Sequence, residues 1–310
     1  MKRRFDLVKF VSKVQGPPQI KAMSSNTLSD AYRDSITIAY QYIGSNVADP
    51  GFELFGRRYD TPVFCGPIGL RGKGPESGMV GYAKAITEAG SLFWADYHDP
   101  EAWGKVLEAG CNALRVIKPL ADLDKFAEEI RKDEARGAHG YATDLDHGLT
   151  PYGEMDGQAE AFAPKTVDDL RFLNGVSTLP FYLKGVMSVH DALLAKEAGV
   201  AGFVISNHNN RFPCAVPPLK ILPEIRKAVG PDVKIFVDGG MNTGYDVFKA
   251  LALGADGVLC ARTMAGAFIK DGEEGLTQRI AEITAELMGA MANTGSKDLQ
   301  HINRGSVILP

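Results

Sequence analysis

The sequence lacks the features that would place it in several broad protein classes. It has no run of about 20 apolar residues, the length that a membrane-spanning helix requires. Its formal net charge of -4 leaves no basic surface of the kind that binds nucleic acid. The basic start, from Met1 to Arg4, is followed by no apolar run, so we predict no export signal. These absences predict a soluble globular protein that binds neither nucleic acid nor a membrane.

Two further absences concern cysteine and glycine motifs. Cys65, Cys111, Cys214 and Cys260 show no C-x-x-C spacing, and three of them lie in strand-like apolar runs. We interpret them as reduced structural thiols of a cytoplasmic protein, and we predict no metal site. No G-x-G-x-x-G motif opens a helix after a strand, which disfavours a Rossmann dinucleotide fold.

Apolar runs alternate with amphipathic stretches along most of the chain. The chain has 310 residues, 45% of them hydrophobic and 23% charged, which is enough for a sizeable core in one or two domains. The candidate strands are residues 62–68, 91–95, 113–117, 140–143, 180–183, 202–206, 234–237 and 257–260. The candidate helices are residues 77–89, 99–109, 121–136, 166–175, 188–198, 217–229, 243–252 and 273–292. Eight βα units with doubly apolar strands predict a closed (β/α)8 barrel; a doubly wound open sheet is the alternative, because spacing does not show closure.

Two segments depart from this alternation. Residues 1–60 carry apolar residues at helical spacing from Leu28 to Ile43, so we predict a short N-terminal helical cap segment before a barrel of residues 61–310. The loop from Asp144 to Lys165 contains five acidic residues and no arginine. Loops longer than about 12 residues are usually lids, binding loops or disordered segments, and the sequence leaves these choices open.

The ends of the predicted strands carry many polar side chains, and in a (β/α)8 barrel these ends form the active site. His208 and Arg211 follow the sixth strand, where an imidazole can take a proton near pH 7 and a guanidinium can hold a carboxylate. Lys184 ends the fifth strand. A lysine there can be a nucleophile, a counter-ion for an anionic cofactor or a solvated side chain. The candidates for a phosphate site end the seventh and eighth strands and are Asp238, Gly239, Gly240, Ala261 and Arg262.

Several motifs together resemble one known family. They are Leu183-Lys184-Gly185-Val186, Ser206-Asn207-His208-x-x-Arg211, Phe236-Val237-Asp238-Gly239-Gly240, the run from Asp246 to Ala255, and Ala261-Arg262. In order and spacing they resemble the FMN-dependent α-hydroxy-acid oxidase and dehydrogenase family, which includes glycolate and lactate oxidases. The resemblance covers residues 180–308 and extends more weakly back to Pro62. It implies a (β/α)8 barrel, FMN as the cofactor, and assembly as a homo-oligomer, commonly a tetramer.

The resemblance also implies roles for individual residues. His208 would be the active-site base, Asp144 would orient it, and Arg211 would grip the substrate carboxylate. Lys184 would lie near N1 of the flavin and stabilise the reduced ring. The residues implied to hold the ribityl chain and phosphate are Asp238, Gly239, Gly240, Ala261 and Arg262, and those implied to present backbone groups to the isoalloxazine edge are Pro67, Ile68 and Gly69.

The substrate side departs from the family pattern. Arg115 stands where the family has a tyrosine, and no arginine follows the fourth strand. Asp96 takes the place of a flavin-contacting serine, and His98 stands where an aromatic residue is frequent. Cys214 replaces an aspartate and Asn242 an arginine. We therefore hypothesise that Arg115 supplies a second cation for the substrate carboxylate, with His98 as a further substrate contact.

The resulting prediction is an FMN-dependent oxidoreductase that oxidises a small 2-hydroxy acid or a related carboxylate. His208 would act as the base while hydride passes to flavin N5, and a carbanion route fits the same residues. Two alternatives stay open: an FMN-dependent isomerase-like enzyme with no net oxidation, and a flavin- or phosphate-binding barrel without turnover. The motifs do not identify the substrate or the electron acceptor.

Overall fold

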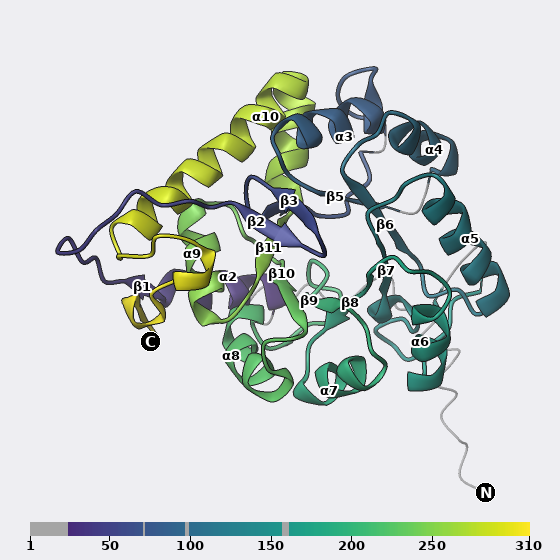
Figure 1. Cartoon of the computed structure of the whole chain (residues 1–310). Helices are drawn as coiled ribbons and strands as arrows, with labels where there is room; N and C mark the ends of the chain where they lie inside the picture. Colours follow the sequence, from purple (N-terminus) through teal and green to yellow (C-terminus); the bar gives the residue numbers. More distant parts are fainter. Residues whose placement is uncertain (1–23, 71, 97–98, 157–160) are drawn as a thin grey trace, which may run out of the picture.

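The chain forms a closed barrel of eight strands, which confirms the predicted (β/α)8 fold (Figure 1). The computed structural model describes residues 24–70, 72–96, 99–156 and 161–310. Each strand runs parallel to its neighbours, and the strands follow one another around the barrel in chain order. They are β4 (Val63–Cys65), β5 (Phe93–Asp96), β6 (Ala113–Ile117), β7 (Tyr141–Asp144), β8 (Phe181–Val186), β9 (Gly202–Ile205), β10 (Lys234–Val237) and β11 (Gly257–Cys260).

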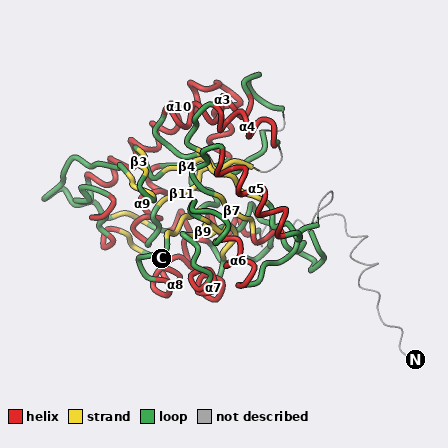
Figure 2. The backbone as a smooth tube through the Cα atoms, turned by 45° about the vertical axis from the view of Figure 1, so that its right-hand side comes forward, coloured by secondary structure: helices red, strands yellow, loops and turns green. Residues whose placement is uncertain are grey.

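Helices surround the barrel on its outside (Figure 2). Several begin at a side chain that accepts a hydrogen bond from the first turn; Thr166 and Thr243 form capping boxes with the aspartate three residues later. The helices between and after the strands are α3 (Gly78–Glu88), α4 (Pro100–Glu108), α5 (Leu123–Ala135), α6 (Val167–Asn174), α7 (Val189–Glu197), α8 (Pro218–Val229), α9 (Gly244–Leu253) and α10 (Arg262–Ala292).

The last helix is longer than the sequence predicts. Gly272, at φ 68° and ψ -154°, interrupts the helical conformation inside α10. The predicted helix of residues 273–292 is the part after this break, and the structure adds a first part that begins at Arg262. The start of α10 therefore lies directly at the end of β11.

Side chains alternate along each strand, so the barrel has an inner and an outer part of its core. The inward side chains form one apolar cluster: Phe64, Trp94, Leu114, Val116, Ala142, Tyr182, Val204, Phe236 and Leu259. The intervening strand residues belong to the larger cluster shared with the helices. The residue two positions after the last inward side chain of a strand then lies on the inner side of the barrel mouth.

The N-terminal segment is only partly helical. α2 (Ser25–Ser35) packs against α8 and is followed by β1 (Thr37–Ile38), which pairs with β12 (Val307–Ile308). The predicted helix from Leu28 to Ile43 is therefore wrong at both ends. Ile36 is buried and, at ψ 127°, is no longer helical. The next two residues, to which the apolar spacing assigned a helix, pair with β12 instead. The division of the chain near residue 60 stays a prediction.

A hairpin of β2 (Phe52–Leu54) and β3 (Arg57–Tyr59) closes the end of the barrel opposite the mouth. The Phe52 and Tyr59 ring centroids lie 5.6 and 5.4 Å from that of Phe64 inside the barrel. His139 joins the hairpin through its Nδ1, 2.9 Å from the Tyr59 hydroxyl, and its Nε2, 3.0 Å from Arg57. Burial, with a smaller effect of Arg57, lowers the pKa of His139 to about 4.

The remaining described features are short. Three 3-10 turns are η2 (Leu145–His147), η3 (Leu299–His301) and η4 (Arg304–Ser306). Cys65, Cys111 and Cys260 are buried free thiols, whereas Cys214 is exposed. Among the helices that the structure describes, none has the length and apolar character needed to cross a membrane.

Candidate active site

A cavity of about 1230 Å³ opens at the C-terminal ends of the barrel strands. The sequence-predicted site residues among its lining are Pro67, Ile68, Gly69, Asp96, Asp144, Lys184, His208, Asp238, Gly239, Gly240, Ala261 and Arg262. The structure thus brings these residues together, and their individual roles stay predictions. His98 lies outside the described residues.

Buried charges cross the floor of the cavity in an alternating order. Lys118 Nζ lies 2.6 Å from Asp144 Oδ2, and Lys184 Nζ lies 3.6 Å from Asp144 Oδ1 and 3.4 Å from Asp238 Oδ2. Burial opposes the ionisation of Asp144, but Lys184 and Lys118 outweigh it and hold the pKa of this carboxyl well below its usual range. Burial alone would lower the pKa of Lys184, whereas Asp238 and Asp144 raise it. Asp144 and Lys184 therefore stay charged at neutral pH.

His208 takes its orientation from Asp146. Its Nδ1 lies 2.8 Å from Asp146 Oδ2, and because a carboxylate only accepts, Nδ1 carries the proton. The prediction that Asp144 orients His208 is wrong, because Asp144 is already bound by Lys118, and the turn η2 carries Asp146 to the imidazole instead. The neutral tautomer leaves Nε2 as a proton acceptor in a side chain that lines the cavity.

Arg211 points at the loop after β7. Its Nε donates to the Asp146 backbone oxygen at 2.6 Å, its Nη2 donates to the Leu149 oxygen at 2.9 Å, and Nη2 also pairs with Asp156. The Asp156 carboxylate lies 3.0 Å from His147 Nδ1 as well. Among the described residues that line the cavity, His208 is present and Arg211 is not. In this structure the guanidinium of Arg211 is engaged by the loop after β7, and its role in gripping the substrate carboxylate stays a prediction.

Arg115 lies outside the barrel, between the strand and the helices. Its side chain is 2% exposed, with Nε 2.9 Å from Asp133 and Nη2 2.8 Å from Glu129. The prediction that Arg115 binds the substrate is wrong, because position 115 falls on the outward face of β6. Lys118 is the cation from this strand end that reaches the cavity.

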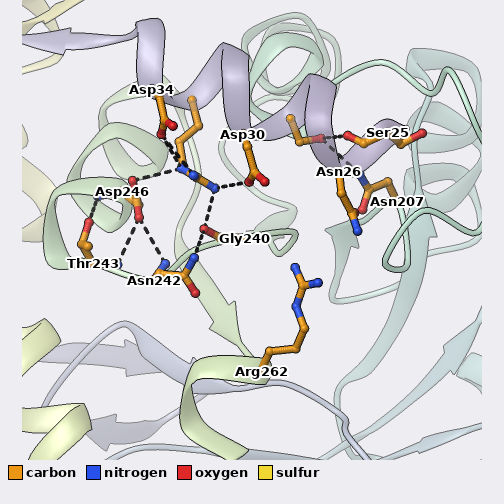
Figure 3. Close-up of polar contacts among 12 residues, drawn as sticks. Ser25, Asn26, Asp30, Asp34, Asn207, Gly240, Asn242, Thr243, Asp246 and Arg262 are labelled. Carbon is orange, nitrogen blue, oxygen red and sulfur yellow. Dashed lines mark hydrogen bonds and ion pairs between the residues drawn. The ribbon is translucent and has the colours of Figure 1, made fainter. Parts of the chain in front are cut away.

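Helix α2 holds the turn that carries His208. His208, Asn209 and Asn210 have positive φ values of 45°, 54° and 68°, a conformation that costs free energy in residues other than glycine and that asparagine tolerates best. The Ser25 N–H donates to Asn210 Oδ1 at 2.7 Å, and Asn26 Nδ2 donates to Asn209 Oδ1 at 2.9 Å. These contacts fix the strained turn. Figure 3 shows Ser25 and Asn26 of α2 beside Asn207, the residue before the turn.

The same helix also reaches the glycine turn after β10. Arg33 Nη1 donates to the Gly240 oxygen at 2.7 Å, and Arg33 Nε lies 3.3 Å from Asp246 (Figure 3). Asp246 in turn accepts from the backbone of Asn242 and Thr243 at 3.1 Å each. Sequence reasoning missed this clamp, because α2 and the turn lie about 200 residues apart.

This end of the cavity fits FMN. Gly239 and Gly240 have φ 91° and 90°, and a Cβ on Gly239 would lie 3.4 Å from Asn207 Oδ1. Within the described chain, this buried amide oxygen has no hydrogen-bond donor, and a ribityl hydroxyl is such a donor. Arg262 lies at the start of α10, extends toward Gly240 in Figure 3 and forms no ion pair with another described residue, as a phosphate ligand requires.

The cavity also contains a group of possible metal ligands. Asp144, His147 and His208 each offer one ligand atom, and these atoms lie within 4.8 Å of one another. Lys118 and Lys184 flank Asp144, and their positive charge opposes a cation at the same place.

Comparisons with known proteins agree with the site. The chain matches the family described as FMN-dependent dehydrogenase over residues 34–166 and 153–309. It is 27% identical to a 4-hydroxymandelate oxidase of Amycolatopsis orientalis over 282 residues, 80% of this chain and 79% of that protein. It is 38% identical to a peroxisomal (S)-2-hydroxy-acid oxidase of Oryza sativa subsp. japonica over 210 residues, 64% of this chain but 56% of that protein.

The solved structures give the same result. A mandelate oxidase variant with a monooxide FMN adduct has a TM-score of 0.84 at 25% identity, over 99% of this chain and 100% of that one. The family match covers more than half of the chain, and the glycine turn, Asn207 and Arg262 fit the cofactor. The chain therefore belongs to the FMN-dependent dehydrogenase family, and its cofactor is FMN.

Proposed function

We propose that this enzyme oxidises a small 2-hydroxy acid, or a close derivative of one, to the 2-oxo compound. The observation that carries the proposal is the His208–Asp146 pair, at 2.8 Å, in the wall of the cavity that also contains the buried Lys184. A general base can take the proton of an alcohol as it is oxidised, and a buried cation can stabilise the negative charge that develops.

His208 removes the hydroxyl proton of the substrate. With Nδ1–H donated to Asp146, the imidazole accepts that proton on Nε2, and Asp146 stabilises the imidazolium that results. Such a base contributes about 10²–10⁴-fold to the rate. FMN, when bound, supplies the acceptor for the two electrons of the oxidation.

Lys184 provides a fixed positive charge at the floor of the cavity. Its ammonium group is held by Asp238 and Asp144 and donates to Ser206 Oγ at 3.2 Å, so it does not reorganise during the reaction. With FMN bound, this cation would stabilise negative charge on the ring system of the cofactor.

The test is anaerobic reduction of the purified yellow holoenzyme by lactate, glycolate and mandelate. Bleaching of the visible flavin band supports the proposal. His208→Gln should slow the bleaching about 100-fold or more, whereas the matched change His190→Gln, at an exposed position of α7, should not. If no 2-hydroxy acid or 2-hydroxy amide bleaches the flavin, the proposal fails and an isomerase-like or non-catalytic barrel takes its place.

Two further properties stay proposals. We infer a cytoplasmic enzyme and a homo-oligomer from the cysteine pattern and the family resemblance. Cell fractionation tests the first, and light scattering of the purified holoenzyme tests the second.

A further inference from the structure

The guanidinium of Arg211 is occupied by its own chain. An arginine binds a carboxylate with two parallel hydrogen bonds through one of two edges, Nε with Nη2 or Nη1 with Nη2. Nη2 is part of both. The acceptors of Nη2 are the Leu149 oxygen at 2.9 Å and the Asp156 carboxylate. Nε donates to the Asp146 oxygen at 2.6 Å. A free substrate carboxylate therefore has to displace Asp156 before it can bind Arg211 in the bidentate way.

Asp156 is itself fixed in this position. Its carboxylate also contacts His147 Nδ1 at 3.0 Å, and the His147 ring lies edge-on to that of His208 with centroids 4.8 Å apart. The Arg211 and Asp156 side chains are 18% and 24% exposed, so water screens this pair only in part. The pair thus stands directly beside the proposed base.

The two buried lysines on the floor of the cavity, Lys118 and Lys184, are already paired with carboxylates. Lys118 is bound by Asp144 at 2.6 Å, and residues 144–165 contain no arginine. A carboxylate bound between His208 and Arg211 would approach Asp146 and Asp156, the two carboxylates that these side chains already bind. A site that places like charge against a ligand discriminates against it.

We propose that the Asp156 carboxylate occupies Arg211 in place of a substrate carboxylate. The enzyme therefore selects 2-hydroxy amides, whose carboxamide is neutral, over free 2-hydroxy acids. This inference rests on the proposed function and names its substrate class. A carboxamide brings no charge against Asp156, and its oxygen needs a single donor. The oxidation would otherwise be unchanged: His208 would take the hydroxyl proton, bound FMN would accept the C2 hydrogen with its electron pair, and the product would be the 2-oxo amide.

Binding of unreactive ligands tests the role of Asp156 without turnover. Propionate and propionamide lack the hydroxyl group, and their binding to holoenzyme is followed by the change in the visible flavin spectrum. Wild type should bind propionamide more tightly than propionate. Asp156→Asn should tighten propionate binding at least about tenfold, the scale of one charge-assisted contact, and change propionamide binding less than about twofold.

Two further variants control this test. Glu154→Gln removes the same charge from an exposed position of the same loop and should leave both affinities unchanged. Asp156→Glu keeps a carboxylate and should retain the wild-type preference. FMN content and the circular dichroism spectrum show that each variant is folded. Equal gains in Asp156→Asn and Glu154→Gln, or no gain in Asp156→Asn, would overturn the inference.

Turnover separates this inference from the proposed function. Wild type should be bleached anaerobically faster by lactamide than by lactate, and Asp156→Asn should shift that ratio toward lactate. Faster bleaching by lactate in both proteins leaves the proposed function standing and overturns the selectivity. If neither compound bleaches either protein, the proposed function is wrong. The propionate and propionamide affinities then still decide whether Asp156 keeps a free carboxylate from binding Arg211.

Discussion

Arg115→Met should destabilise the fold and leave substrate binding unchanged. The buried guanidinium joins Asp133 at 2.9 Å and Glu129 at 2.8 Å, with its centre 5.8 Å from the Trp103 ring. Methionine fills a similar volume, so the main loss is the charge. Removing one partner of a buried ion pair costs about 3–5 kcal/mol, because the other charge stays buried without compensation. Asp133, which is 2% exposed, is that charge.

The cost should depend on pH in a defined direction. Burial raises the pKa of Asp133 above its ordinary value even with Arg115 in place. A folded-state pKa above the unfolded one means that the stabilising contribution is present below the unfolded pKa and is lost as pH rises through the folded pKa. Removing Arg115 raises the folded-state pKa further. The deficit of Arg115→Met should therefore be largest near pH 7 and shrink toward pH 4.

Denaturant unfolding of the holoenzyme at pH 7 and pH 4.5 measures both effects. The double variant Arg115→Met with Asp133→Asn should regain part of the lost stability, since the Trp103 Nε1 that donates to Asp133 at 2.8 Å keeps an acceptor. The affinity for propionate or propionamide should match wild type. Wild-type stability together with weakened ligand binding would refute this reasoning and restore Arg115 as a substrate contact.

Three further variants probe other parts of the structure. The pKa of His139 is about 4 in the folded protein, below its value in the unfolded chain, so the unfolded chain binds protons more tightly between pH 6.5 and 4. The stability of the wild type should therefore fall as the pH falls through this range. His139→Gln should reduce that fall. Because His139 is partly exposed beside Arg57, we expect about 1–2 kcal/mol between pH 7 and 4.5. Gly239→Ala, at φ 91°, should cost about 1 kcal/mol and weaken FMN binding, measured by fluorescence of released flavin. Asp146→Asn should lower the rate of flavin reduction about tenfold or more, while FMN content stays unchanged, because His208 loses the charge that stabilises its protonated form.

The fold could be predicted because the strands are short, apolar on both faces and separated by capped helices. Local signals of this kind determine secondary structure wherever tertiary packing does not compete. Residues 36–38 are the counterexample, since their strand partner lies at residues 307–308 and no local pattern shows it. Closure of the barrel likewise depends on contacts between β11 and β4, which are distant in sequence.

The strand pattern also explains which of the predicted site residues line the cavity. Asp96, Asp144, Lys184 and Asp238 each stand two positions after an inward apolar residue, so they reach the cavity. Arg115 lies between the inward residues Leu114 and Val116 and must face the helices, whereas Lys118 follows Val116 by two and faces the cavity. Because all of β6 is buried, hydrophobicity alone did not reveal the inward face. Alternation counted back from the polar residues that end the neighbouring strands would have placed Lys118 on the inward face of β6 and Arg115 on the outward face.

The loop after β7 could not be predicted, since its contacts depend on the turn that carries His208. Asp144 and Asp146 are two residues apart, and an aspartate at either position could orient the imidazole of His208. The choice falls on Asp146 because Lys118 and Lys184 already neutralise Asp144 and because η2 directs the chain back over the cavity. Charge pairing thus decided between two residues that spacing could not distinguish.

His208 and Arg211 are three residues apart, yet they have opposite environments, and the backbone between them is the reason. Consecutive left-handed residues turn the chain so that the imidazole lines the cavity while the guanidinium meets Leu149 and Asp156. Residues of α2 hold this turn through hydrogen bonds to Asn209 and Asn210. The environments of the two motif residues are therefore set separately: Asp146 fixes His208, whereas Leu149 and Asp156 of the loop after β7 bind Arg211.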